Sequence, residues 1–173
     1  MKHYGCNISH QPISNASFGF WPNMIPFIDA GVNVSLGTDG QTQSMFENMR
    51  AAQMIHRIRY EDLNLLPDKQ MFEMATINGA KSLHLENEIG TLEVGKKADI
   101  VLLKNDSPVP VFENNIMNFV VTVADSAHVD TVFIDGNKVV ERGEYLLMDE
   151  DEVRAKCQEQ AVDFWKRNDW PTP

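Results

Sequence analysis

The chain has 173 residues, of which 43% are hydrophobic, so it can bury an apolar core as one domain or two small ones. Its formal net charge is −10, and no Lys/Arg-rich run could follow a phosphate backbone or lie on an anionic membrane. We therefore expect neither nucleic acid nor a membrane as a partner. The start of the chain has no signal-peptide pattern, and its two cysteines make no disulfide framework, so a cytoplasmic location is expected.

The first part of the chain alternates between strand and helix patterns. In order, the patterns predict a strand over 5–9, a polar loop over 10–20, a helix from Pro22 to Gly31, a strand over 32–36, a loop over 37–43 and a helix over 45–56. Such an alternation is typical of parallel strands joined by crossover helices, an α/β arrangement. Functional side chains gather at the carboxyl ends of such strands, where both polar loops fall.

The second part of the chain changes texture after one more helix. This helix is expected to open at Pro67 or Asp68 and to run to about Leu85. Strand patterns follow over 91–94, 98–103, 119–123 and 129–134, and an Asp-Gly-Asn turn at 135–137 leads into another over 138–141. A last helix is predicted from Asp149 to about Trp165, since acidic residues open it and basic ones close it.

Three motifs occur in a fixed order between residues 7 and 101. They are HQPISN at 10–15, AGVNVSLGTDG at 30–40 followed by MFENMR at 45–50, and ATINGAKSL at 75–83 followed by EIGTLEVGKKADIV at 88–101. Together they resemble the amidohydrolase superfamily, in its branch of cytosolic aminohydrolases and chlorohydrolases that act on guanine, adenosine-type and triazine rings. A lone GTDG would be weak evidence, whereas three ordered segments are strong evidence.

The resemblance implies a fold and its limits. Residues 1–88 would form the last two units of a (β/α)8 barrel with the helix that follows, residues 89–147 the C-terminal strands of a small β-sandwich, and residues 148–173 a terminal helix and tail. The family's remaining metal ligands, an H-x-H pair and two later histidines, would precede residue 1, and no H-x-H occurs in this sequence. We therefore expect a C-terminal portion that is inactive alone.

Two alternatives stay open beside an enzyme fragment. One is a non-catalytic scaffold or binding domain, and the other is one chain of a split enzyme whose partner carries the histidines. In each case the exposed strand edges and apolar helix faces of a partial barrel favour self-association or pairing with a missing N-terminal half.

Asp39 is the predicted catalytic residue and metal ligand. It ends an apolar strand in a Gly-Thr-Asp-Gly turn, whose glycines let the backbone bend. The resemblance implies that its carboxylate contacts one divalent metal, zinc or alternatively iron, takes a proton from the attacking water and passes it to the leaving group. The structural alternative is an aspartate that caps the next turn.

Four other residues are predicted to contact a small heterocyclic substrate, namely His10, Ser14, Asn15 and Trp21. His10 could hydrogen-bond a ring nitrogen, and Trp21, with Phe18 and Phe20, could form an aromatic wall. The alternatives are a histidine bonded to loop backbone, ordinary loop-forming Ser and Asn, and aromatic packing against the following helix.

The expected reaction is hydrolysis of a C–N or C–Cl bond of a heterocycle by metal-activated water. The histidines at 56, 84 and 128 have no shared metal spacing and are expected to be structural or solvated. Two departures from the family, a short Gln41–Ser44 linker and His-Gln-Pro in place of His-Cys-Pro, leave the substrate undefined.

Overall fold

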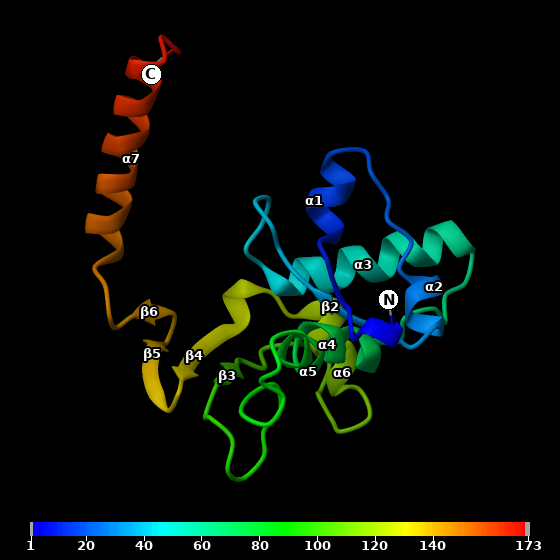
Figure 1. Ribbon diagram of the computed structural model, residues 1–173. Coiled ribbons are helices and arrows are strands. Elements are labelled where there is room, and N and C mark those ends of the chain that lie inside the picture. The colour runs from blue at the N-terminus through cyan, green and yellow to red at the C-terminus, as the bar shows by residue number, and fades with distance from the viewer. Residues whose placement is uncertain (1, 172–173) are drawn as a thin grey trace.

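The computed structural model describes residues 2–171 and shows a helical body, a four-stranded sheet beside it and a terminal helix beyond the sheet (Figure 1). The body begins with η1 (Lys2–Tyr4), β1 (Asn7–His10), α1 (Pro12–Ser17), α2 (Ile25–Asp29), β2 (Asn33–Leu36), α3 (Met45–Tyr60), α4 (Asp68–Ala75) and α5 (Ile77–Ser82). The rest of the chain forms β3 (Ile100–Leu103), α6 (Ile116–Asn118), η2 (Phe119–Val123), η3 (Ser126–His128), β4 (Val129–Ile134), β5 (Asn137–Glu141), β6 (Glu144–Tyr145) and α7 (Glu150–Arg167).

Strands β1 and β2 form a parallel pair, in a register that aligns Asn7 with Asn33 and His10 with Leu36. Both strands were expected from the sequence, and the α/β arrangement is confirmed. Apolar side chains of β2 face α3 and α4, where burial of large side chains supplies most of the stability. The buried cluster contains Met24, Val34, Leu36, Met49, Ala52, Leu66, Met71, Met74 and Val121.

The segment over 10–20 is not only a loop as predicted, because α1 forms within it. Pro12 is the first residue of α1, a position where its missing N–H costs nothing and its fixed φ suits a helix. The sequence patterns did not predict this short helix, because its polar composition gives no apolar periodicity. It places Ser14 close above the end of β2.

The predicted long helix over 68–85 is instead two helices. Thr76 separates α4 from α5, with φ −127° and ψ −94°, and its hydroxyl donates to the carbonyl of Phe72 at 2.7 Å. This backbone bends α5 toward β2, where the side-chain amide of Asn78 donates to the carbonyl of Val34 at 2.9 Å. The helix therefore breaks at Thr76, and α5 gains a contact with β2 that a continuous helix would not make.

Two of the predicted strands do not form. Phe119–Val123 is a π-helix, η2, although its β-branched residues favour a strand. Val121 is fully buried against the core, and Arg50 of α3 donates to the carbonyl of Ala124 at 2.6 Å, so tertiary packing overrides the local preference. Residues 91–94 form an irregular segment with a bend at Thr91 and a turn that begins at Val94, and the apolar Leu92 and Val94 are both exposed.

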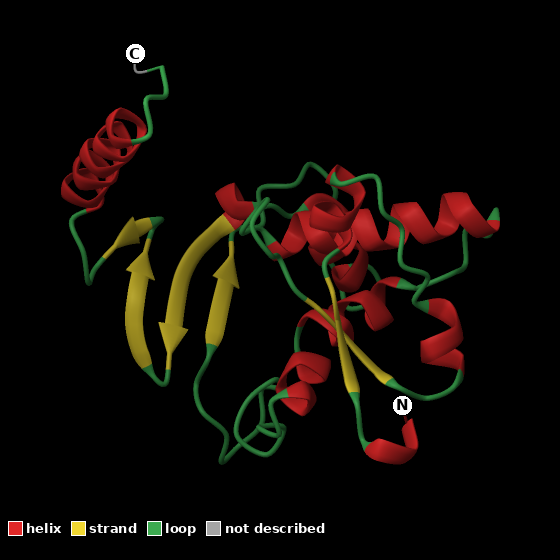
Figure 2. Cartoon of the chain, turned by 45° about the horizontal axis from the view of Figure 1, so that its top comes forward, coloured by secondary structure: helices red, strands yellow, loops and turns green. Residues whose placement is uncertain are grey.

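The four-stranded sheet is antiparallel, in the order β3-β4-β5-β6 (Figure 2). Asp135 and Gly136 join β4 to β5, and both have positive φ, 49° and 77°, as the predicted tight turn requires. Beyond the sheet, Asp149 caps α7 by accepting from the amide of Glu152 at 3.0 Å. No residue of α7 is fully buried. None of the helices in residues 2–171 has the length and apolarity to cross a membrane.

Replacing Ser44 with alanine is expected to lower the free energy of unfolding by about 1 kcal/mol, the usual cost of losing such a cap. The Ser44 hydroxyl accepts from the amide of Glu47 at 3.3 Å and so satisfies the open amino end of α3. Urea denaturation would measure the loss. Ser17→Ala is the matched control, since the Ser17 hydroxyl is exposed and donates to the carbonyl of Ile13 within α1 and not to the amino end of α3. Equal unfolding midpoints for both variants would contradict this role.

Candidate functional site

Ser14 and Asp39 meet at the carboxyl ends of β1 and β2. The hydroxyl of Ser14 donates to Oδ2 of Asp39 at 2.7 Å, across 25 residues of sequence. Ser14 is 2% exposed, whereas Asp39 is exposed. Oδ1 of Asp39 accepts no hydrogen bond from residues 2–171. The pair therefore presents one carboxylate oxygen to solvent and anchors the other.

The loop that carries Asp39 passes close to β1. The amide of Gly37 donates to the carbonyl of His10 at 2.9 Å. A Cβ at Gly37 would lie 2.8 Å from the hydroxyl oxygen of Ser9, closer than real contacts allow. Asp39 itself has φ 55°, the left-handed region that Asp tolerates better than most residues. Gly37 and this turn together direct Asp39 toward α1.

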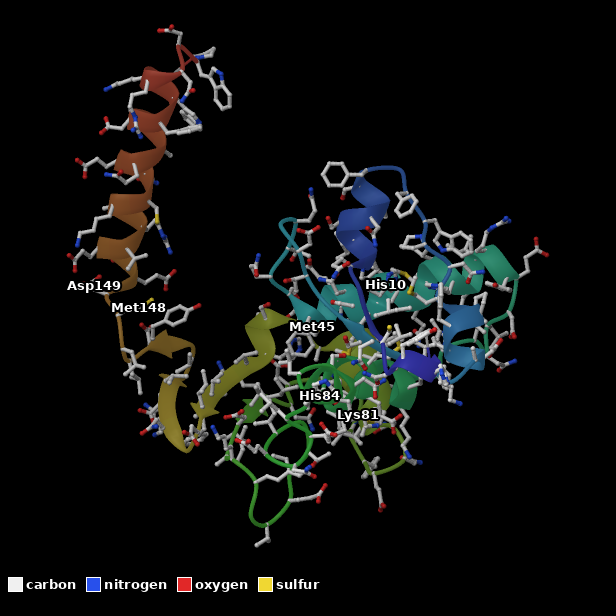
Figure 3. The ribbon with its side chains drawn as sticks, viewed as in Figure 1. His10, Met45, Lys81, His84, Met148 and Asp149 are labelled. Carbon is white, nitrogen blue, oxygen red and sulfur yellow. The ribbon has the colours of Figure 1, made fainter. Side chains whose placement is uncertain are left out.

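His10 lies within the body, below α1 (Figure 3). It is 3% exposed, and neither of its ring nitrogens has a hydrogen-bond partner among the described residues. Its ring meets that of His56 edge-on at 5.5 Å between centroids. Burial, and secondarily the nearby His56, lowers the pKa of His10 from 6.5 to about 4. His10 is therefore neutral at pH 7.

His56 is the partner of His10 on α3, and it is fully buried. Its Nδ1 donates to the carbonyl of Ala52 at 2.8 Å, and its Nε2 accepts from the amide of Met24 at 3.2 Å. Burial lowers the pKa of His56, against the opposing effect of the bond to Ala52. These bonds fix one neutral tautomer, so His56 is structural, as expected from the sequence.

Trp21 belongs to the same cluster as the two histidines. Its ring lies 5.7 Å from that of His56, and the guanidinium of Arg59 lies 5.4 Å above its centroid. Its indole nitrogen is buried without a partner among the described residues. Phe18 and Phe20 are 79% and 62% exposed, so neither packs into the core.

The five predicted site residues thus fall into separate places. Ser14 and Asp39 are joined by a hydrogen bond, whereas His10 and Trp21 pack around His56, and the half-buried side chain of Asn15 makes no hydrogen bond within residues 2–171. The role of His56 as a neighbour of His10 was missed. Its position on the apolar face of the predicted helix was the available signal.

Asp39 suits one ligand position of a metal site. A carboxylate with one free oxygen, on a loop at the end of a strand, matches the oxygen ligands that zinc accepts. Across residues 2–171, no three His, Cys, Asp or Glu side chains are grouped closely enough to hold a metal. Asp39 is therefore a candidate for a single ligand, and the described residues supply no complete metal site around it.

Curated relatives cover nearly all of this chain. It is 38% identical over 162 residues to a 5-methylthioadenosine/S-adenosylhomocysteine deaminase of Acetivibrio thermocellus, covering 91% of this chain and 38% of the relative. A 5'-deoxyadenosine deaminase of Methanocaldococcus jannaschii is 37% identical over 164 residues, covering 92% and 38%. The chain thus spans little more than a third of the length of these relatives.

Solved structures share the fold. An adenosine deaminase from Xanthomonas campestris with bound zinc superposes with a TM-score of 0.81 at 25% identity, covering 88% of this chain and 36% of that one. The guanine deaminase of E. coli gives a TM-score of 0.72 at 26% identity, covering 81% and 34%. Residues 2–139 match the amidohydrolase family, so the chain belongs to that family, as its three motifs predict.

Proposed function

We propose that this chain is the C-terminal part of a zinc-dependent aminohydrolase. In this proposal β1 and β2 are the last two strands of a (β/α)8 barrel, and β3 to β6 belong to a small β-sandwich. The barrel part comprises residues 1–88, the sandwich part residues 89–147, and the terminal helix and tail residues 148–173. The superposition on the zinc-containing adenosine deaminase supports this assignment, as does the position of the motifs. A cytoplasmic location and a missing N-terminal half as the partner belong to the same proposal.

The proposed reaction removes the amino group of an adenosine-type nucleoside. Water attacks the ring carbon that carries the amine, the C–N bond breaks, and ammonia leaves while the carbon becomes a carbonyl. Relatives at 37–38% identity are deaminases of adenosine derivatives, whereas the chlorohydrolase structures are 23–24% identical and support the fold alone. This difference favours deamination over release of chloride.

The observation that carries the proposal is the carboxylate of Asp39, which is exposed and has one oxygen held by the Ser14 hydroxyl. Zinc, when bound, activates a water molecule at neutral pH. Asp39 would hold the metal, accept the proton of the attacking water and deliver it to the departing nitrogen. Zinc is the proposed metal because it is present in the superposed deaminase, and iron(II) is the other metal that this oxygen ligand suits.

Substrate contacts by His10, Asn15 and Trp21 stay predictions. The packing of the buried His10 and the half-buried Trp21 around His56 supports a wall of the site more than groups that touch the substrate. In a completed protein, replacing such a wall residue is expected to lower the free energy of unfolding more strongly than it lowers the turnover rate.

Completion of the barrel tests the proposed function. The upstream part of the Acetivibrio thermocellus deaminase, ending where the match to this chain begins, would be fused to this chain and loaded with zinc. Ammonia release from 5'-deoxyadenosine is the expected result. A zinc-loaded, folded protein that releases no ammonia from this or related adenosine derivatives would favour the non-catalytic scaffold instead.

The chain by itself is expected to keep less than one zinc ion per molecule after dialysis against a mild chelator, because one carboxylate cannot make a tetrahedral site. Metal analysis after dialysis measures this, and the fused protein is the control, which should retain about one ion per chain. Stoichiometric zinc in the dialysed chain alone would contradict the assignment of Asp39 as a lone contributed ligand.

A further inference from the structure

Ser14 has a single hydroxyl proton, and the structure commits that proton to Asp39. The donor is 2% exposed and lies 2.7 Å from Oδ2, so the bond is shielded from water on the serine side. A hydrogen bond to a charged carboxylate is shorter and stronger than a neutral one. A serine placed in this way is poorly suited to contact a substrate directly.

Helical serines commonly donate to the carbonyl four residues earlier, and Ser17 of the same helix does so, to Ile13 at 2.9 Å. The carbonyl four residues before Ser14 belongs to His10, which lies in β1 outside the helix and accepts the amide of Gly37 at 2.9 Å. The parallel strand pair thus extends by one bond beyond β2, and the Ser14 hydroxyl turns to the loop that follows. Helix α1 therefore contains Ser17, whose hydroxyl bonds within the helix, and Ser14, whose hydroxyl bonds Asp39 outside it.

We propose that Ser14 is a positioning residue for Asp39: its hydroxyl holds Oδ2 and leaves Oδ1 free, as the oxygen that would bind a metal. The left-handed backbone of Asp39, with φ 55°, sets the direction of the side chain, and Ser14 sets its rotamer. This inference rests on the proposed function for the metal, but the rotamer itself does not depend on metal.

The first test uses the full 173-residue chain without metal. Three-bond NMR couplings from the backbone to the Asp39 carboxyl carbon report its rotamer. We expect couplings of one dominant rotamer in the parent chain and in Ser17→Ala, and averaged couplings in Ser14→Ala. Couplings for Asp39 that stay unchanged in Ser14→Ala would overturn the proposal.

The second test uses the completed protein and separates positioning from substrate binding. Ser14→Ala should weaken zinc affinity by about tenfold or more, as loss of a group that orients a metal ligand usually does. It should lower kcat with little change in KM, whereas loss of a substrate contact would raise KM. Ser17→Ala should leave zinc affinity, kcat and KM unchanged, because the Ser17 hydroxyl bonds Ile13 and not Asp39.

The outcomes distinguish this inference from the proposed function. If Asp39→Asn weakens zinc binding and Ser14→Ala does not, the positioning role is wrong and the proposed function stands. If Asp39→Asn leaves zinc affinity unchanged, the proposed function fails, and only the metal-free rotamer result then decides whether Ser14 holds Asp39. If Ser14→Ala raises KM and leaves zinc affinity and kcat unchanged, Ser14 contacts the substrate and does not position Asp39.

Discussion

Replacing Asp39 with asparagine in the completed deaminase is expected to slow ammonia release by about 10²-fold to 10⁴-fold, the range typical of a proton-transfer group, and further if zinc is lost. Asparagine keeps the shape of the side chain but cannot take the proton of the attacking water. It also tolerates the left-handed backbone at this position, where φ is 55°, so the fold should survive. Steady-state kinetics on zinc-loaded protein measure the effect.

Asp29→Asn is the matched control for this change. Asp29 is an exposed aspartate in α2 that forms no ion pair or side-chain hydrogen bond among residues 2–171, so its replacement should leave turnover unchanged. Zinc content and the urea midpoint should be compared for both variants. A zinc-loaded Asp39→Asn protein as fast as its parent would remove Asp39 from the reaction and favour the scaffold interpretation of this chain.

The chain is expected to lose stability on acidification because His10 must be neutral when buried. Its pKa is about 4 in the folded state and 6.5 in its ordinary state, so the unfolded chain binds more protons between these two values. The free energy of unfolding therefore falls as pH drops through this window, by roughly 3 kcal/mol in total and roughly 2 kcal/mol between pH 7 and pH 5. Urea denaturation across that range measures the slope.

His10→Gln should reduce the acid slope, since glutamine does not titrate, even though the variant is less stable at pH 7. Part of the slope should remain, because burial lowers the pKa of His56 as well. His84→Asn is the control: His84 is exposed and has φ 58°, which asparagine tolerates, so the slope should match the parent. An unchanged slope in His10→Gln would mean that His10 is not the group that titrates.

Local patterns predicted those elements whose residues agree with their surroundings. Helix α3 follows an apolar period, and β1 and β2 pack Ile8, Val34 and Leu36 in or against the core, as their patterns indicate. The turn at Asp135 and Gly136 and the charge order of α7 depend on residues close in sequence, so both could be recognised. The three ordered motifs likewise indicate the family from the sequence alone, without knowledge of any tertiary contact.

Two of the failures, at η2 and at Thr76, share one physical cause. η2 winds into a π-helix because Val121 is buried against α3 and α4, and Thr76 breaks a helix so that Asn78 can bond β2. Both choices depend on contacts with segments more than forty residues away, which a local pattern does not contain. Polar α1 failed for the opposite reason, since no apolar period marks it.

The amino-acid sequence by itself determined the family, the alternation of strands and helices and the identity of Asp39 as the candidate ligand, because these reside in short motifs and in local periodicity. Only the tertiary structure decided which side chains meet. The parallel pairing of β1 with β2 brings Ser14 to Asp39, and the packing of α3 against α1 and β2 brings His56 to His10. Such pairings depend on the three-dimensional register of distant segments, and sequence spacing carries no record of that register.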